Sequence, residues 1–457
     1  MNPPKIIAGL TGPAASFFLG SNLFLDSLPR PLLLITPTEK EAEARVEELR
    51  LFLPSHFTII NFPSWETKPF DLLTPSRFSI AERLGMLWKL HNTPLIIVAP
   101  VEALMQKVTP KKDFLHYSIT LEFAQTLDLG NFKKQLSVLG YQFQEQVTDI
   151  GDVAIRGNII DIFSPAHKDP LRLELFGDEI ESIRSFDPDT QLSGVSLDRM
   201  VIIPSREVLW STEHISLGKK RIKELSDTQG IPKATRDQWL DQLHEGFFFR
   251  EIENWVPLFY ASLSTIFDYF PSQTFVLYDS QRIHELANTF EEEYRQNWDL
   301  ATKELRLVPH YKELFLSSEE LFQIIDPKTV LKIEPLIRTD LPEGEKIHVE
   351  LITGITPASH ALSVDPLKPL ISHFQQWRKE GDHIVVATHT LEQAIRLREL
   401  LGSHDFETRR IETSLLEAIP HLTGKERVVH TILGSVENGF RYFPEHLTLI
   451  SEEEIFG

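Results

Sequence analysis

The sequence of 457 residues is too long for one hydrophobic core, so we expect several domains of ordinary size, roughly three or four. Hydrophobic residues make up 42% and charged residues 25% of the chain, and the apolar runs fall well short of the roughly 20 residues that cross a bilayer. Acidic residues number 66 against 46 basic ones, so the net charge of -20 argues against nonspecific binding of the whole chain to nucleic-acid phosphates.

The first hundred residues alternate short apolar runs with amphipathic segments, which is typical of a parallel α/β layer. The strand-like runs are KIIAGL (5–10), PLLLITP (31–37), TIINFP (58–63) and PLIIVAP (94–100). After the second run, Thr36 followed by proline and, three residues on, by Glu39 has the pattern of a capped helix start. A helix is therefore predicted from residue 37.

From about residue 117 to 205 the pattern changes to short strands and turns after the helical run LGNFKKQLSVLG, which predicts a separate α+β domain inserted into the first fold. Residues 206–270 are helical and aromatic in character, and a buried strand in TFVLYDS resumes the parallel sheet. A last α/β unit has strands in DHIVVAT, RVVHTIL and LTLIS and a helix in LEQAIRLRELLG. The predicted domains are residues 1–115, 116–205, 206–330 and 331–457.

A loop resembling a phosphate-binding loop follows the first strand, at residues Gly9 to Ser16. Beyond Gly9 and Gly12, the working pattern G-x-x-x-x-G-K-[ST] needs a second wrapping glycine, a lysine for the β and γ phosphates and a hydroxyl for magnesium. Those three places hold Ala14, Ala15 and Ser16. Without the lysine the loop lacks its main positive charge, so we expect no ATP hydrolysis from it.

The acidic pair that should end a partner strand is also incomplete. Asp279 follows FVLY, but Ser280 and Gln281 stand where a second acid would organise the attacking water. We therefore interpret this strand end as a packing element. Weak nucleotide binding without turnover is the alternative.

Taken together, a series of runs resembles one family, the transcription-repair coupling factors, whose N-terminal part is similar to the excision-repair protein UvrB. They are GLTGPAAS, NFPSWETKPFDLLTPS, SIAERLGMLWKL, LIIVAPVEALMQKV, LGYQFQEQVTDIGDVAIRGNIIDIFSP, LRLELFGDEIESIRSFDPDTQLS, IIPSREV, IENWVPLFY, IFDYFP and GFRYFPEHLTLISEEEIFG. Between Phe70 and Arg83 the chain is too short for the long DNA-clamping hairpin of UvrB, which favours the coupling factors.

The resemblance implies a multidomain α/β fold: a degenerate P-loop helicase-like parallel sheet, split by an inserted α+β domain that docks UvrA, and followed by a small α/β domain. Family contacts carried over by motif are Arg156, Arg172 and Phe176. Strand alternation places the last two on one face. We expect that changing both arginines to alanine abolishes UvrA binding and leaves the thermal melt unchanged.

The function implied is that of an adaptor without ATPase or helicase activity, which recruits UvrA in transcription-coupled repair. The polymerase-binding and translocase domains of the family have no counterpart in the motifs, so contacts with RNA polymerase and DNA are expected only through such further domains. The alternative is an ATP-dependent helicase or excision-nuclease subunit in which other residues rescue the nucleotide site.

No cofactor or metal is expected, because the 17 histidines include no H-x-x-x-H pair and the chain has no cysteine. The start, MNPPKIIAGLTG, lacks the features of a secretory signal. With no apolar segment long enough for a membrane span, the cytoplasm is the expected location.

Overall fold

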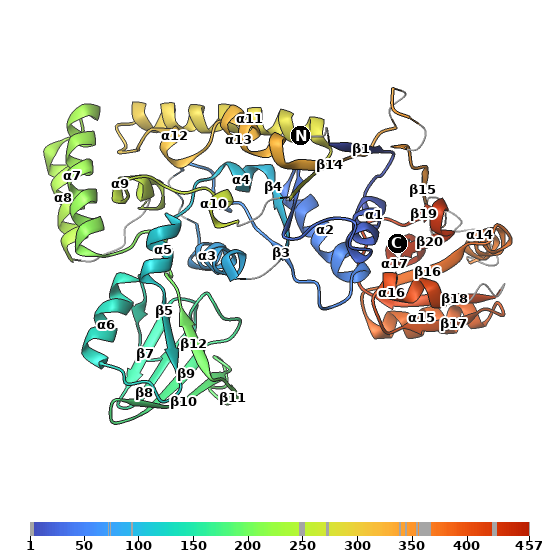
Figure 1. Cartoon of the computed structure of the whole chain (residues 1–457), viewed down its shortest axis with the longest axis horizontal. Helices are drawn as coiled ribbons and strands as arrows, with labels where there is room; N and C mark the ends of the chain where they lie inside the picture. The colour runs from blue at the N-terminus through green and yellow to red at the C-terminus, as the bar shows by residue number, and fades with distance from the viewer. Residues whose placement is uncertain are drawn as a thin grey trace.

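The computed structural model describes residues 4–71, 73, 75–92, 95–245, 252–270, 274–337, 340–342, 345–352, 355, 367–422 and 427–456. It is a mixed α/β protein with three six-stranded sheets and one two-stranded sheet. In Figure 1 the sheet that contains β1 to β4 and its helices form the middle of the molecule. The second sheet, β6 to β11, lies below it on the left, and the third, β15 to β20, lies at the right-hand end.

The first sheet is parallel throughout, in the order β1-β14-β13-β2-β4-β3. Its members are β1 (Lys5–Ala8), β2 (Leu32–Thr36), β3 (Ile59–Asn61), β4 (Ile96–Pro100), β13 (Thr274–Tyr278) and β14 (Thr329–Glu334). The central strands β2, β4 and β13 are buried at every position, because helices cover both faces. That burial explains their continuous apolar runs, and the strands predicted in this region are confirmed.

Helices from distant parts of the sequence cover this sheet. They are α1 (Pro13–Phe24), α2 (Glu39–Phe52), α3 (Arg77–Asn92), α4 (Val101–Met105), α10 (Ile266–Tyr269), α11 (Ser280–Lys303), α12 (Tyr311–Leu314) and α13 (Ser318–Ile325). The order of the sheet shows that the chain leaves it after β4 and returns at β13.

The predicted start of α2 was wrong by two residues. Thr36 is the fully buried last residue of β2, and its hydroxyl donates to the carbonyl of Thr38 at 3.1 Å. Thr38 is the N-cap instead, since its side chain accepts from the amide of Glu41 and donates to the Glu41 carboxylate at 2.6 Å. The capping pattern recurs two residues later, where the strand has ended.

The second sheet has the order β11-β10-β9-β8-β7-β6 and lies in the segment between β4 and β13. Its strands are β6 (Gln142–Phe143), β7 (Asp152–Arg156), β8 (Ile159–Ile162), β9 (Leu171–Phe176), β10 (Glu179–Phe186) and β11 (Ser193–Ser196). Beside it lie the pair β5 (Ile119–Glu122) and β12 (Arg199–Ile202), with α5 (Lys111–Tyr117) and α6 (Leu129–Val138). The predicted α+β character of this region is confirmed.

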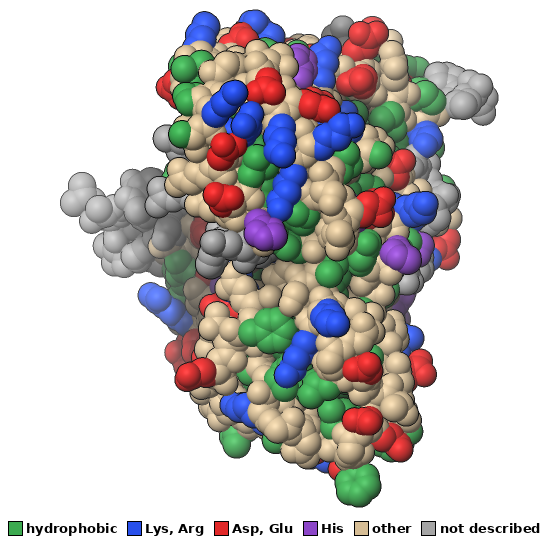
Figure 2. All heavy atoms as spheres, turned by 90° about the vertical axis from the view of Figure 1, so that its left-hand side faces the viewer, with side chains coloured by type: hydrophobic (Ala, Val, Ile, Leu, Met, Phe, Trp, Pro, Cys, Tyr) green, Lys and Arg blue, Asp and Glu red, His purple; other side chains and the backbone are tan. Residues whose placement is uncertain are grey.

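A helical layer follows, made of α7 (Thr212–Gln229), α8 (Lys233–Glu245) and α9 (Val256–Phe259). Residues 246–251 of the predicted aromatic segment lie outside the described residues. Ile222 and Trp255 belong to the same core as Leu136 and Leu173 of the second-sheet region. Figure 2 shows this side of the molecule, with lysine and arginine side chains interspersed among acidic ones on its upper, helical half.

The third sheet has the order β15-β19-β20-β16-β18-β17. Its elements are β15 (Val349–Leu351), β16 (His383–Thr388), β17 (Glu407–Ile411), β18 (Val428–Leu433), β19 (Phe440–Tyr442) and β20 (Leu447–Ser451), with α14 (Lys368–Lys379), α15 (Leu391–Gly402), α16 (Leu415–Ala418) and α17 (Glu452–Phe456). The strands and helix predicted here are confirmed. The boundary predicted between residues 330 and 331 falls inside β14, which pairs with β1 and β13, so the first sheet extends to Glu334.

Candidate functional site

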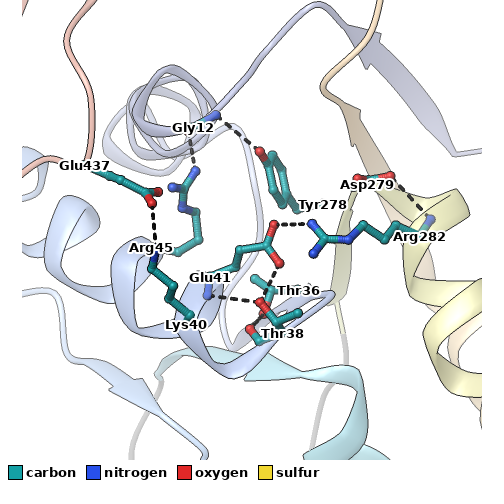
Figure 3. Close-up of polar contacts among 10 residues, drawn as sticks. All are labelled: Gly12, Thr36, Thr38, Lys40, Glu41, Arg45, Tyr278, Asp279, Arg282 and Glu437. Carbon is teal, nitrogen blue, oxygen red and sulfur yellow. Dashed lines mark hydrogen bonds and ion pairs between the residues drawn. The ribbon is translucent and has the colours of Figure 1, made fainter. Parts of the chain in front are cut away.

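The loop at Gly9 to Ser16 lies at the carboxyl edge of the first sheet. Gly9 and Gly12 both have positive φ, at 91° and 51°, and α1 begins directly after Gly12. The Gly12 amide donates to the Tyr278 hydroxyl at 3.2 Å, and the Arg45 guanidinium donates to the Gly12 carbonyl (Figure 3). Side chains of this chain therefore occupy both backbone polar groups of Gly12.

Behind the loop, α2 contributes a buried ion pair. Arg45 and Glu48 are 2% and 1% exposed and approach to 3.0 Å. The Ser16 hydroxyl donates to the same Glu48 carboxylate at 2.6 Å. Burial raises the pKa of Glu48 to about 7, although Arg45 and Ser16 act to lower it. The hydroxyl expected to bind magnesium in a working loop is thus committed to a side chain of α2.

The first turns of α1 are packed on the third-sheet domain. Ala14 is fully buried and Ala15 is 2% exposed. Phe17, one turn on, makes an edge contact with Tyr442 at 5.1 Å between ring centroids and another with Phe52 at 5.6 Å. A side chain longer than alanine at position 15 would have to displace packed protein.

Asp279 lies at the same edge, after β13, in a left-handed conformation with φ of 59°. Its carboxylate caps α11 by accepting from the amide of Arg282 at 3.3 Å, and burial raises its pKa, with Arg282 opposing. The Arg282 guanidinium in turn pairs with Glu41 at 2.8 Å, as Figure 3 shows. These contacts hold helix starts in place.

The sequence interpretation missed Arg45 and Glu48. A signal was present, since both charged residues occur on the buried stripe of α2 that also includes Ala42, Val46 and Leu49. A charged pair on an apolar stripe indicates a buried ion pair rather than a solvated face.

The second predicted site lies on one face of the second sheet. Arg156 of β7 and Arg172 of β9 both contact Asp161 of β8, which lies between them. Arg172 donates from Nε and Nη2 to the two oxygens of Asp161 at 2.6 and 2.9 Å, a bidentate arrangement. The Asp161 side chain has no exposed area, so two cations cover one buried anion.

Arg172 is held on its other sides as well. Its guanidinium lies 4.6 Å from the centre of the Phe186 ring and donates to the side chain and carbonyl of Gln191 at 3.3 and 3.4 Å. The hydrogen bonds to Asp161 raise the pKa of Arg172. Its side chain is only 14% exposed, whereas that of Arg156 is 47% exposed. Arg156 is therefore the arginine that is more available to a partner.

Phe176 is 78% exposed and ends β9, beside the turn into β10. Strand parity places it on the same face as Arg172, as predicted. The Leu175 amide bonds to the carbonyl of Asn158 at 2.8 Å, so the end of β9 lies beside the turn that follows Arg156. The sheet thus presents an aromatic ring at its rim and a cation cluster further in. We call Arg156, Asp161, Arg172 and Phe176 the basic-aromatic face.

Asp161, Phe186 and Gln191 were missed by the sequence interpretation. The run NIIDIF has an aspartate at a strand position flanked by buried isoleucines, which was the available signal for Asp161. For the variant in which both arginines are changed to alanine, the ion pairs of Asp161 lead us to expect a lower melting temperature than that of the parent, in place of an unchanged thermal melt. Removing both cations would leave the Asp161 carboxylate buried without its ion-pair partners, which is strongly destabilising.

Within the described ranges, no group of three or more histidine, aspartate or glutamate side chains could hold a metal ion. In the same part of the chain, the helices are too short or too polar to span a membrane.

Comparison with known proteins places the basic-aromatic face in a recognised domain. Residues 119–208 match the family described as UvrB interaction domain. The chain is 30% identical over 450 residues to the transcription-repair-coupling factor of Myxococcus xanthus, 26% over 459 residues to that of Escherichia coli and 24% over 468 residues to that of Bacillus subtilis.

These alignments cover 94 to 99% of this chain and 37 to 38% of the three relatives, so the chain spans well under half of their length. The similarity extends across all three large sheets. The chain is therefore homologous to the N-terminal, UvrB-like part of the transcription-repair coupling factors, with a UvrB interaction domain at residues 119–208.

Proposed function

We propose that this chain acts in transcription-coupled DNA repair as an adaptor that binds UvrA through the basic-aromatic face. The observation that carries the proposal is the cluster of Arg156, Asp161 and Arg172 with the exposed ring of Phe176, inside the segment that matches the UvrB interaction domain. The resemblance to the coupling factors supplies the identity of the partner.

The chemistry of this face suits a protein partner. Phe176 offers a large apolar surface that becomes buried on contact, and arginine beside an aromatic ring is a common composition of interface hot spots. Two arginines and one aspartate give the cluster a net charge of +1 on a chain of net charge -20. A carboxylate of the partner would pair with Arg156, so binding should weaken as salt is added.

The proposal includes the absence of nucleotide hydrolysis and a helicase-like first sheet split by the docking domain. Ala15 stands in the place of the phosphate-binding lysine, and Ser16 is bonded to the buried Glu48. Asp279 caps α11. These contacts support the proposal that the loop at Gly9 to Ser16 has a structural role and binds no phosphate.

Titration of UvrA with the purified chain tests the adaptor function. Phe176→Ala should weaken binding by about 30-fold, which corresponds to about 2 kcal/mol, because an exposed aromatic anchor is lost. Phe443→Ala, which truncates another exposed phenylalanine in the third-sheet domain, is the matched control. Equal affinities for both variants and the parent would refute the assignment of the face.

Two further measurements test the shared docking site on UvrA and the absence of ATP hydrolysis. UvrB should compete with the chain for UvrA, and independent binding of the two would argue against a shared docking site. A phosphate-release assay with ATP and DNA should give no turnover above background. Steady release that is lost in Asp279→Asn would instead establish the ATPase alternative.

A further inference from the structure

The basic-aromatic face continues across the second sheet toward the first domain. Arg172 lies over the ring of Phe186, and Phe186 packs in one apolar cluster with Val147, Ala154 and the half-buried Phe163. Phe163 directly follows β8, two residues after Asp161, and its amide still donates to the carbonyl of Asp152 at 3.1 Å. The extended backbone therefore continues, and both side chains are on the same face. A row of two aromatic side chains, Phe186 and Phe163, therefore runs from Arg172 to the end of β8.

That row ends in a cavity of about 370 Å³ between the second sheet and the start of α3. It is lined by Arg77, Phe78, Thr148, Asp149, Ile150 and Phe163. Phe78 is in the first turn of α3, and its side chain is 62% exposed at the rim of the cavity. Phe78 lies outside the matched segment 119–208, so the docking family does not include it.

The arginine in this cavity is not available to bind an anion. The Arg77 guanidinium donates to Gln142 at 3.1 Å, to the carbonyl of Ile150 at 3.1 Å and to Asp152 at 3.0 Å. Asp152 is 2% exposed, so this ion pair fixes the position of α3 against the second sheet. The other lining side chains are the apolar Phe78, Ile150 and Phe163 and the exposed, polar Thr148 and Asp149. The apolar side chains suit an apolar side chain of a partner, with the two polar residues at the exposed rim.

We propose that this cavity, with Phe78 at its rim, is a second contact point for the protein that docks on the basic-aromatic face, and that it receives an apolar side chain of that protein. The proposal rests on the proposed docking function and extends its surface from the second sheet onto α3. Continuity of the aromatic row argues for the same occupant at both places. An apolar anchor in a cavity and a charged contact at a rim are the two usual parts of one interface.

Titration of the full chain with UvrA tests this inference. Phe78→Ala should raise the dissociation constant about tenfold, and Thr148→Trp, which fills the cavity from its exposed rim, should raise it by a similar factor. Both side chains are exposed, and the Thr148 side chain contributes only a long hydrogen bond of 3.5 Å to Asp152, so the thermal melts should stay close to that of the parent. Phe443→Ala again serves as the control.

Phe176→Ala separates the two proposals. Loss of binding in Phe176→Ala, with Phe78→Ala and Thr148→Trp indistinguishable from the control, would overturn the second contact point and leave the docking function standing. If UvrA binds neither the parent nor any variant, both the docking function and the second contact point are refuted. Weakened binding in all three variants, with Phe443→Ala unchanged, supports both.

Discussion

Asp161 and Arg172 face each other across β8 and β9 and are joined by two hydrogen bonds of 2.6 and 2.9 Å. The contact fixes the rotamer of Arg172 before any partner arrives, and the same aspartate also holds Arg156. A guanidinium held in this way loses less entropy on binding than a mobile one. The face is therefore preorganised, and its stability and its binding capacity depend on one buried carboxylate.

This dependence predicts different costs for the two arginines. Arg172→Ala should lower the free energy of unfolding by about 3 to 5 kcal/mol, because it removes the bidentate partner of a buried charge. Arg156→Ala should cost about 1 kcal/mol or less, since its side chain is 47% exposed. Urea denaturation of both variants measures the difference. Equal costs would show that Arg172 is not the main partner of Asp161.

A second prediction concerns pH. Burial raises the pKa of Glu102 in α4 from 4.5 to about 7, with Glu293 and Glu39 adding to the shift. A raised carboxyl pKa means that the folded chain binds the proton more tightly, so its contribution to stability is complete below about pH 4.5 and is lost as pH rises through 7. Glu102→Gln should therefore match the parent at pH 4.5 and exceed it by about 1 to 3 kcal/mol at pH 8.

Denaturation at the two pH values checks this expectation, with Glu453→Gln, a change at an exposed glutamate, as the control. A gain of the same size at both pH values would show that the effect of the Glu102 change is not linked to proton binding.

A third prediction tests whether the loop at Gly9 is closed to nucleotide. Ala15→Lys restores the phosphate-binding residue but places a charge at a position that is 2% exposed. It should destabilise the chain by about 3 kcal/mol and confer no ATP binding, because Arg45 and the packed face of α1 occupy the space. Phe24→Lys, at an exposed position of the same helix, should be nearly neutral. ATP binding by a stable Ala15→Lys variant, measured calorimetrically, would contradict the packing argument.

A fourth prediction concerns the junction between the first and third sheets. Phe17 is fully buried and contacts Tyr442 and Phe440 across this junction. Phe17→Ala should cost about 3 to 5 kcal/mol and expose the third-sheet domain to separate unfolding. Limited proteolysis and a calorimetric scan with two transitions would reveal that. A single transition at the parent temperature would show that the junction does not depend on this ring.

Much of the fold could be predicted because the buried parallel strands β2, β4 and β13 are continuous apolar runs. Short apolar runs bounded by turn residues are typical of buried strands. The start of α2 could not be placed correctly, because Thr36 and Thr38 both have the chemistry of a cap and only the end of β2 distinguishes them. The boundary predicted at residue 330 falls inside β14, because nothing local in the sequence shows that β14 pairs with β1, a strand near the start of the sequence.

The site was predictable only in part. Motif resemblance supplied Arg156, Arg172 and Phe176, and alternation placed the last two on one face. Alternation could not show that Asp161 is buried, because its burial depends on contacts with Arg156 and Arg172 of the neighbouring strands. The burial of this side chain depends on the order of the strands in the sheet, which cannot be predicted from the residues around Asp161.

The pairing of β1 with β14 also affects how the chain folds during synthesis. Lys5 can pair with Leu331 only after Leu331 has been synthesised. At ribosomal rates of about 5 to 20 residues per second, this delay is on the order of 15 to 70 s. The strands of the second sheet emerge and pair with close neighbours long before that. The docking domain can therefore fold on the ribosome while β1 still lacks β14 and β2 still lacks β13. During that interval chaperones would protect the unpaired edge of β2.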